Sequence, residues 1–154
     1  MSAHETEIAI VGAGQTGAPL ALALAQAGFD VALIDARDPH AARPADMRNY
    51  AIVTGSWRLL KAIGIADEIV SETVALHGLE AVDGGTHWFG APQALFGDDD
   101  LAVRDEDETL GRMVEASILQ AALDKAIAAE PKITLFAPAR FSHADAKPGQ
   151  IDVH

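Results

Sequence analysis

Three glycines near the start of the chain carry the most specific chemistry that the sequence predicts. Gly12, Gly14 and Gly17 stand in a Gly-x-Gly-x-x-Gly pattern directly after a short apolar run. In a dinucleotide site the first glycine permits a tight turn, the second lets the backbone approach a pyrophosphate, and the third lets helix and strand pack closely. The helix that follows offers free N–H groups and its positive dipole end to the anion. The alternative is a structural turn that binds nothing.

A carboxylate follows this motif at the spacing that a nucleotide site needs. Asp35 comes about 20 residues further on, where a carboxylate accepts hydrogen bonds from the hydroxyls of an adenosine ribose. Phosphate on that ribose would place negative charge against negative charge, so NADP is disfavoured at this site. FAD and NAD share the same ADP half, so this motif leaves both open.

The elements that position these residues form a strand, glycine turn, helix and strand. Residues 8–11 and 31–34 are short apolar runs typical of buried parallel strands. The stretch between them is rich in leucine and alanine, which predicts a helix from residue 15 or 16 to residue 27, ended by Gly28. Pro19 fits this helix only in its first turn.

The rest of the chain predicts a mixture of helices and strands. A helix is expected at 50–63, with Ser56 as its N-cap, and a second at 112–129, whose apolar residues lie on one stripe. Residues 74–103 alternate short apolar pieces with glycine, proline and aspartate, which favours short strands and hairpins. Further strands are expected at 132–136, 139–144 and 151–153.

Composition excludes several classes of function. The 154 residues carry 11 Lys+Arg against 23 Asp+Glu, a net charge of −12, so no nucleic-acid partner is expected. With no cysteine, disulfides and cysteine-ligated metals are excluded. No apolar run approaches the ~20 residues of a membrane span, so we expect no integral membrane segment and a cytoplasmic location.

Two other clusters are weaker candidates for chemistry. The acids at 98–100 and 105–108 lack the ligand spacing of an EF-hand, so a solvated hairpin rim is expected there. The six histidines show neither a HExxH motif nor a short i, i+4 pair, so no metal site is expected.

Three later blocks resemble one family of flavoproteins. The chain is similar there to FAD-dependent aromatic hydroxylases of the ubiquinone-biosynthesis type, which are class A flavoprotein monooxygenases. The blocks are Asp46-Met47-Arg48, then Gly55-Ser56 with Leu59-Leu60 and Gly64, then Leu110-Gly111-Arg112-Met113-Val114-Glu115 with Leu119 and Leu123. The resemblance implies an α/β, Rossmann-like FAD/NAD(P)-binding fold, a parallel sheet with a β-meander, and a partial β-rich inserted subdomain. The FAD-binding domain would comprise residues 1–73 and 104–154, and the inserted part residues 74–103.

The resemblance also implies a set of cofactor contacts. The glycine turn would line the FAD pyrophosphate, Asp35 would hold the adenosine ribose, and Arg37 would lie near the adenosine. Arg48, oriented by Asp46, would approach the phosphate and ribityl side, and Arg112 would lie beside the cofactor. The full cofactor-binding set is Gly12, Ala13, Gly14, Thr16, Gly17, Asp35, Ala36, Arg37, Arg48 and Arg112. No catalytic residue is predicted.

The implied activity is hydroxylation of a small aromatic substrate, such as a ubiquinone precursor, with FAD, NAD(P)H and O₂. Ala116 departs from the asparagine that the family often has, and a second FAD motif is absent up to His154. The chain therefore resembles the amino-terminal part of such an enzyme, with an open meander edge that favours a homo-oligomer. A non-catalytic nucleotide-binding fragment is one alternative. An NAD-dependent dehydrogenase is another, disfavoured because the expected elements turn to strands after residue 74.

Overall fold

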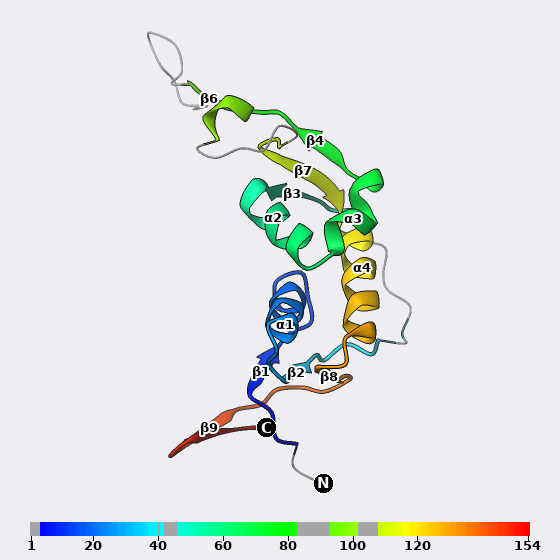
Figure 1. The fold of residues 1–154 in the computed structure, drawn as a ribbon, viewed down its shortest axis with the longest axis vertical. Coiled ribbons are helices and arrows are strands. Elements are labelled where there is room, and N and C mark those ends of the chain that lie inside the picture. The colour runs from blue at the N-terminus through cyan, green and yellow to red at the C-terminus, as the bar shows by residue number, and fades with distance from the viewer. Residues whose placement is uncertain (1–3, 40, 42–45, 83–92, 102–107) are drawn as a thin grey trace.

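A three-stranded parallel sheet carries the glycine turn (Figure 1). The computed structural model describes residues 4–39, 41, 46–82, 93–101 and 108–154. Strands β1 (Ile8–Val11), β2 (Val31–Ile34) and β8 (Ile133–Phe136) pair in the order β1-β2-β8. Val31, Ala32 and Leu33 of the central strand are buried, as a strand covered on both faces requires. The strands predicted at 8–11, 31–34 and 132–136 are confirmed, the last to within one residue.

Helix α1 (Gly17–Gln26) connects β1 to β2, and Thr16 is its N-cap. Pro19 is the third residue of the helix, in the first turn, where its missing N–H removes no intrahelical hydrogen bond. The helix ends at Gln26 with Ala27 as its C-cap, and Gly28 follows with a φ of +104°, the left-handed conformation that glycine adopts without strain. The predicted placement of Pro19 in the first turn is confirmed, and the predicted start and end of the helix agree with the structure to within two residues.

A second, antiparallel sheet contains the first residues of two segments that were predicted to be helices. Strands β3 (Asn49–Val53), β7 (Gly111–Glu115) and β4 (Val74–Leu76) pair in the order β3-β7-β4. The helices predicted at 50–63 and 112–129 are therefore wrong over their first residues. Helix α2 (Thr54–Ala62) and helix α4 (Ala116–Ala129) begin only after these strands. The predicted N-cap role of Ser56 is also wrong, because Val53 occupies the N-cap position.

Pairing in register explains why β3 and β7 are strands. The side chains of β3 alternate between half-buried and exposed, which is the period of a strand with one covered face. Gly111 pairs with Val53, and a Cβ on Gly111 would lie 2.3 Å from the carbonyl oxygen of Ile52. The two backbones thus approach more closely than any side chain at position 111 would allow.

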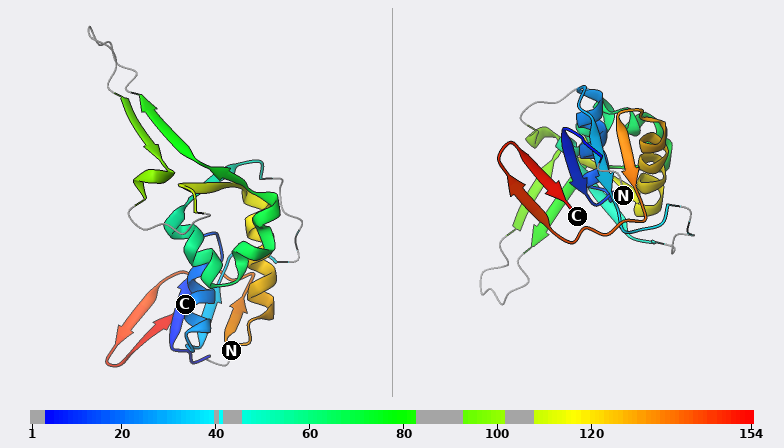
Figure 2. Two further views of the ribbon diagram at one scale, coloured as in Figure 1. Left: turned by 45° about the horizontal axis from the view of Figure 1, so that its top comes forward. Right: turned by 90° about the horizontal axis from the view of Figure 1, so that it is seen from below.

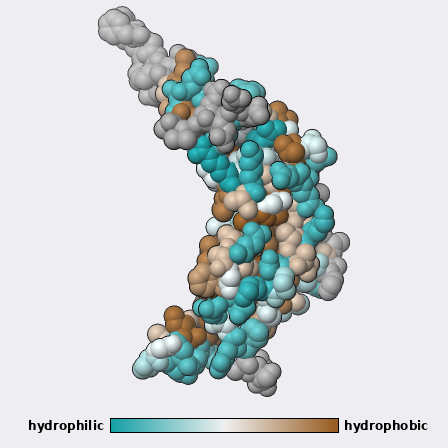
Figure 3. All heavy atoms as spheres, viewed as in Figure 1, coloured by the Kyte–Doolittle hydropathy of each residue, from teal (hydrophilic) through white to brown (hydrophobic). Residues whose placement is uncertain are grey.

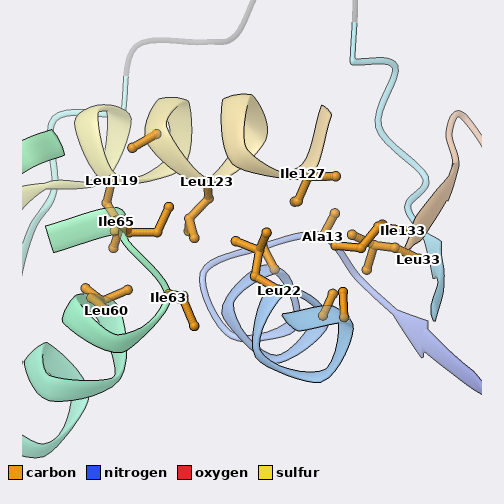
Figure 4. Close-up of a cluster of buried hydrophobic side chains, with 14 of the residues drawn as sticks. Ala13, Leu22, Leu33, Leu60, Ile63, Ile65, Leu119, Leu123, Ile127 and Ile133 are labelled. Carbon is orange, nitrogen blue, oxygen red and sulfur yellow. The ribbon is translucent and has the colours of Figure 1, made fainter. Parts of the chain in front are cut away.

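The core lies where α4 packs across α1 and a short helix, α3 (Ile65–Ile69). Leu119, Leu123 and Ile127 point from α4 toward Ile65 and Leu22 (Figure 4). Since α4 follows β7 and precedes β8, one continuous helix joins the antiparallel sheet to the parallel sheet. The 3-10 turn η1 (Val70–Glu72) leads from α3 to β4.

Two hairpins project from opposite ends of the molecule (Figure 2). One is β5 (Gly78–Val82) with β6 (Gln93–Gly97), and the other is β9 (Ala144–Lys147) with β10 (Gln150–Val153). Both carry exposed hydrophobic side chains (Figure 3). The strand predicted at 139–144 is wrong in position, because β9 begins only at Ala144.

The predicted acidic rim divides into two parts. Asp98–Asp100 forms the 3-10 turn η2, and residues 105–107 lie outside the described part of the chain. Glu108 is buried, which corrects its predicted solvated position, and it accepts hydrogen bonds of 2.7 and 2.5 Å from Arg58. None of the described helices combines the length and apolar character that crossing a bilayer needs.

Candidate cofactor site

The three glycine positions of the turn are under different structural constraints. Gly12 has φ +100°, a conformation that residues with a Cβ rarely adopt. A Cβ on Gly17 would lie 1.9 Å from the carbonyl oxygen of Gly12, so the turn closes only with glycine there. Gly14 has an ordinary φ, and a Cβ on it would meet nothing within 4 Å. Position 14 is therefore restricted by neither the backbone nor a neighbour.

Gly14 instead faces a cavity of about 670 Å³. The cavity lies between the first turn of α1, the residues after β2, the segment leading into β3, and the first turns of α4. Its lining residues are Gly14, Gln15, Thr16, Arg37, Asp46, Arg48, Tyr50, Ala116, Ser117 and Gln120. Of the predicted site residues, Gly14, Thr16, Arg37 and Arg48 are thus brought together on one cavity.

The N-terminus of α1 adds an anion-binding character to this cavity. Thr16 makes no side-chain capping hydrogen bond, and the first turn of the helix contains no acidic residue. Pro19 has no N–H, and the N–H of Ala18 donates a 2.9 Å hydrogen bond to the carbonyl oxygen of Gly14, so the anion-binding character rests mainly on the positive dipole end of the helix. Gln15 donates a 3.1 Å hydrogen bond to the carbonyl oxygen of Ala116 and so ties the turn to α4.

Asp35 is fixed at the carboxyl end of β2, beside the glycine turn. One of its carboxylate oxygens accepts a 2.7 Å hydrogen bond from the N–H of Ala13, and the other accepts a 2.8 Å bond from the N–H of Arg37. Ala36 between them is exposed. The carboxylate predicted from spacing therefore touches the turn directly, although Asp35 itself does not line the cavity.

Arg48 is held in the cavity wall by Asp46. Its Nε and Nη2 donate hydrogen bonds of 2.9 and 2.7 Å to the two carboxylate oxygens, the bidentate geometry of a strong pair. These hydrogen bonds lower the pKa of Asp46 to about 2 and raise the pKa of Arg48. The guanidinium also lies 5.7 Å from the ring centre of Tyr50. The orienting role predicted for Asp46 agrees with this geometry.

Arg112 lies apart from this cavity. It lines a second, smaller cavity of about 170 Å³ with residues that include Trp57 and Glu108. Its Nε donates a 2.6 Å hydrogen bond to Thr73, and the guanidinium lies 5.4 Å from the ring centre of Trp57. The cofactor contact predicted for Arg112 remains a prediction that this placement does not support.

Sequence reasoning missed the contribution of α4. Ser117 and Gln120 line the larger cavity, and Gln120 is buried and donates a 3.0 Å hydrogen bond to the carbonyl oxygen of Ala13. A signal was present, since Gln120 is a polar residue within a largely apolar helix. Its role became visible only when α4 was placed against the glycine turn.

The terminal hairpin brings together two of the histidines and a carboxylate. The Nε2 atoms of His143 and His154 lie 3.7 and 3.5 Å from one carboxylate oxygen of Asp145. All three side chains are exposed, and the two imidazoles stack with their centres 4.6 Å apart. His143 and Asp145 are two residues apart in the sequence, and the antiparallel pairing of β9 with β10 brings His154 next to them.

The parallel sheet, the glycine turn and the carboxylate after the second strand together define a dinucleotide-binding domain of the α/β class. The model of the family described as FAD binding domain matches residues 5–144. The chain therefore belongs to this family of FAD-binding domains.

Curated relatives narrow the resemblance. The chain is 37% identical over 141 residues to 3-demethoxyubiquinol 3-hydroxylase of Escherichia coli K12, and the match covers 90% of this chain and 34% of that protein. It is 36% identical over 138 residues to ubiquinone hydroxylase UbiL of Rhodospirillum rubrum, and this match covers 88% of this chain and 30% of that protein. The predicted resemblance is confirmed, and the chain spans about a third of the length of these relatives.

Solved structures agree with the fold. The p-nitrophenol 4-monooxygenase PnpA from Pseudomonas putida DLL-E4 is 16% identical with a TM-score of 0.71, and the match covers 95% of this chain and 35% of that one. The flavin-dependent monooxygenase PieE, solved with FAD and substrate, is 19% identical with a TM-score of 0.68, covering 96% and 26%. The predicted α/β fold class is confirmed.

Proposed function

We propose that this chain is the FAD-binding part of a monooxygenase that hydroxylates a small aromatic ring, with a ubiquinone precursor as the substrate. The observation that carries the proposal is the opening of Gly14 onto a cavity that also contains the N-terminus of α1 and the guanidinium of Arg48. The names of the curated relatives supply the substrate class.

The residues present fit FAD in their chemistry. The open space at Gly14 is where a side chain would exclude a ligand, and the start of α1 suits the pyrophosphate. Asp35 would accept hydrogen bonds from the adenosine ribose, and Arg48 suits the phosphate and ribityl side because its planar fork matches phosphate oxygens. Bound FAD would supply the redox chemistry with NAD(P)H and O₂.

The chain's own residues would therefore bind and orient rather than react. In the described lining of the larger cavity the carboxylate of Asp46 is paired with Arg48, and its lowered pKa keeps it ionised and unsuited to donating a proton at neutral pH. We accordingly assign no acid or base. A cytoplasmic location and NAD(P)H as co-substrate remain parts of this proposal.

A visible absorption spectrum and an FAD titration of the purified chain test the proposal. We expect stoichiometric FAD binding that Gly14→Val abolishes, because the valine side chain would fill the space beside the turn. Gly55→Val is the matched control, since Gly55 also has open space around its Cβ position but lies in α2, outside the cavity lining.

The two alternatives give different results in the same titration. A chain that binds NAD but not FAD would be a dehydrogenase-type module, and a chain that binds neither would be an inert fragment. Wild-type affinity in Gly14→Val would show that the turn is structural only.

A further inference from the structure

A closed ring of polar contacts links α4 to both halves of the predicted nucleotide site. Asp35 accepts the N–H of Ala13 at 2.7 Å, and the guanidinium of Arg37 lies 3.9 Å from Asp35 and 3.6 Å from Asp124. Asp124 accepts a 3.0 Å hydrogen bond from Gln120, and Gln120 donates another of 3.0 Å to the carbonyl oxygen of Ala13. The ring thus returns to the residue at which it began.

Gln120 is the buried member of this ring. Its side-chain nitrogen has two hydrogens to donate, and the two acceptors are Ala13 and Asp124. The residue is only 8% exposed and its bond to Ala13 is buried, so water cannot freely replace that bond. Removing the amide would leave the carbonyl oxygen of Ala13, in the middle of the glycine turn, without this donor.

Asp124 adds negative charge beside Asp35, where the adenosine ribose is predicted to bind. It lies one helical turn after Gln120 and shares the guanidinium of Arg37 with Asp35. In the described part of the chain, two carboxylates lie within 4 Å of this one guanidinium. Hydroxyl donors are favoured there, and an additional phosphate is disfavoured.

We propose that Gln120 and Asp124 are positioning residues for the ADP half of the cofactor, and that Asp124 helps to select an unphosphorylated ribose. Gln120 fixes the glycine turn relative to α4. Asp124 holds Arg37 and, through it, the carboxylate that would contact the ribose. This inference rests on the proposed function, because it assumes that the ADP half binds at the glycine turn and Asp35.

The test compares affinities for FAD, ADP and an ADP analogue phosphorylated at the adenosine ribose, each titrated into the full 154-residue chain. In Gln120→Met we expect the affinity for FAD and ADP to fall about tenfold, which corresponds to 1.4 kcal/mol. Gln26→Met is the control, since Gln26 also donates to a backbone carbonyl, that of Ile63, but lies at the C-terminal end of α1, away from the glycine turn. Its ADP affinity should equal that of the wild type.

Asp124→Asn provides a readout that loss of stability would not change. Asparagine still accepts the bond from Gln120 but removes the charge beside Arg37. We expect the affinity for the phosphorylated analogue to rise about threefold relative to ADP, the size of effect that a partly exposed ion pair gives.

Each outcome decides between the alternatives. Wild-type ADP binding by Gln120→Met, an equal loss in Gln26→Met, or an unchanged ratio in Asp124→Asn would overturn the inference while the proposed function stands. If Gln120→Met does not fold, the ratio in Asp124→Asn decides alone. A wild-type chain that binds neither FAD nor ADP would overturn the proposed function itself, and the positioning role with it.

Discussion

The residues of the glycine turn separate the requirements of folding from those of binding. Gly12 provides a backbone conformation, Gly17 provides contact between helix and strand, and Gly14 provides open space at a cavity. Only the last of these requirements concerns a ligand. A substitution at position 14 should therefore lower nucleotide affinity and leave stability nearly unchanged, whereas a substitution at position 17 should lower stability.

We expect Gly17→Ala to lower the free energy of unfolding by about 2 kcal/mol, because its Cβ would overlap the carbonyl oxygen of Gly12 and force the turn open. Gly14→Ala is the control and should change stability by less than about 0.5 kcal/mol, since its Cβ meets no atom. Urea unfolding monitored by circular dichroism measures both. Equal stabilities of the two variants would contradict this account of the turn.

At the scale of elements, the local sequence pattern was sufficient to predict helices and strands whose structure is determined within one segment. The run at 8–11 is followed by Gly12, the helix by Gly28, and the run at 31–34 lies between Asp30 and Asp35, so their positions follow from the chain itself. The starts of α2 and α4 were not predictable in this way. Residues 49–53 and 111–115 are strands because they pair with each other across about 60 residues of chain, and neither segment alone shows that pairing.

The candidate site also contains both kinds of contact, those set within one local unit and those made by packing of distant segments. Asp35 and the glycine turn belong to one local unit, and the contact between Asp35 and Ala13 follows from the topology of two parallel strands. Gln120 reaches Ala13 from more than 100 residues away, and only the packing of α4 against α1 brings it there. A pattern within one segment contains no information about such a contact.

The packing of α4 leads to a prediction about stability. Leu123 is fully buried between the helices, so Leu123→Ala should lower the free energy of unfolding by about 2 to 5 kcal/mol. Leu20→Ala makes the same change on α1 at a side chain that is 48% exposed, and should cost less than about 1 kcal/mol. Chemical denaturation of both variants measures the difference. Similar midpoints would mean that the packing of Leu123 between the helices contributes little to stability.

At the scale of the whole molecule, the two projecting hairpins expose hydrophobic surface that a single copy of the chain does not cover. On the hairpin of β5 and β6, Leu95 and Phe96 are 68% and 49% exposed, and Ile151 of β10 is 67% exposed. Hairpins with exposed apolar side chains and open edges favour association between copies.

We expect the chain to associate in a concentration-dependent way, and Leu95→Lys to shift it toward the monomer by placing a charge at an exposed apolar position of β6. Ile151→Lys places the same charge on the other hairpin, so comparing the two variants identifies the hairpin responsible. Light scattering during size-exclusion chromatography measures the mass of each. A wild-type chain that remains monomeric at every concentration would show that these hairpins do not drive self-association, and would remove the expected homo-oligomer.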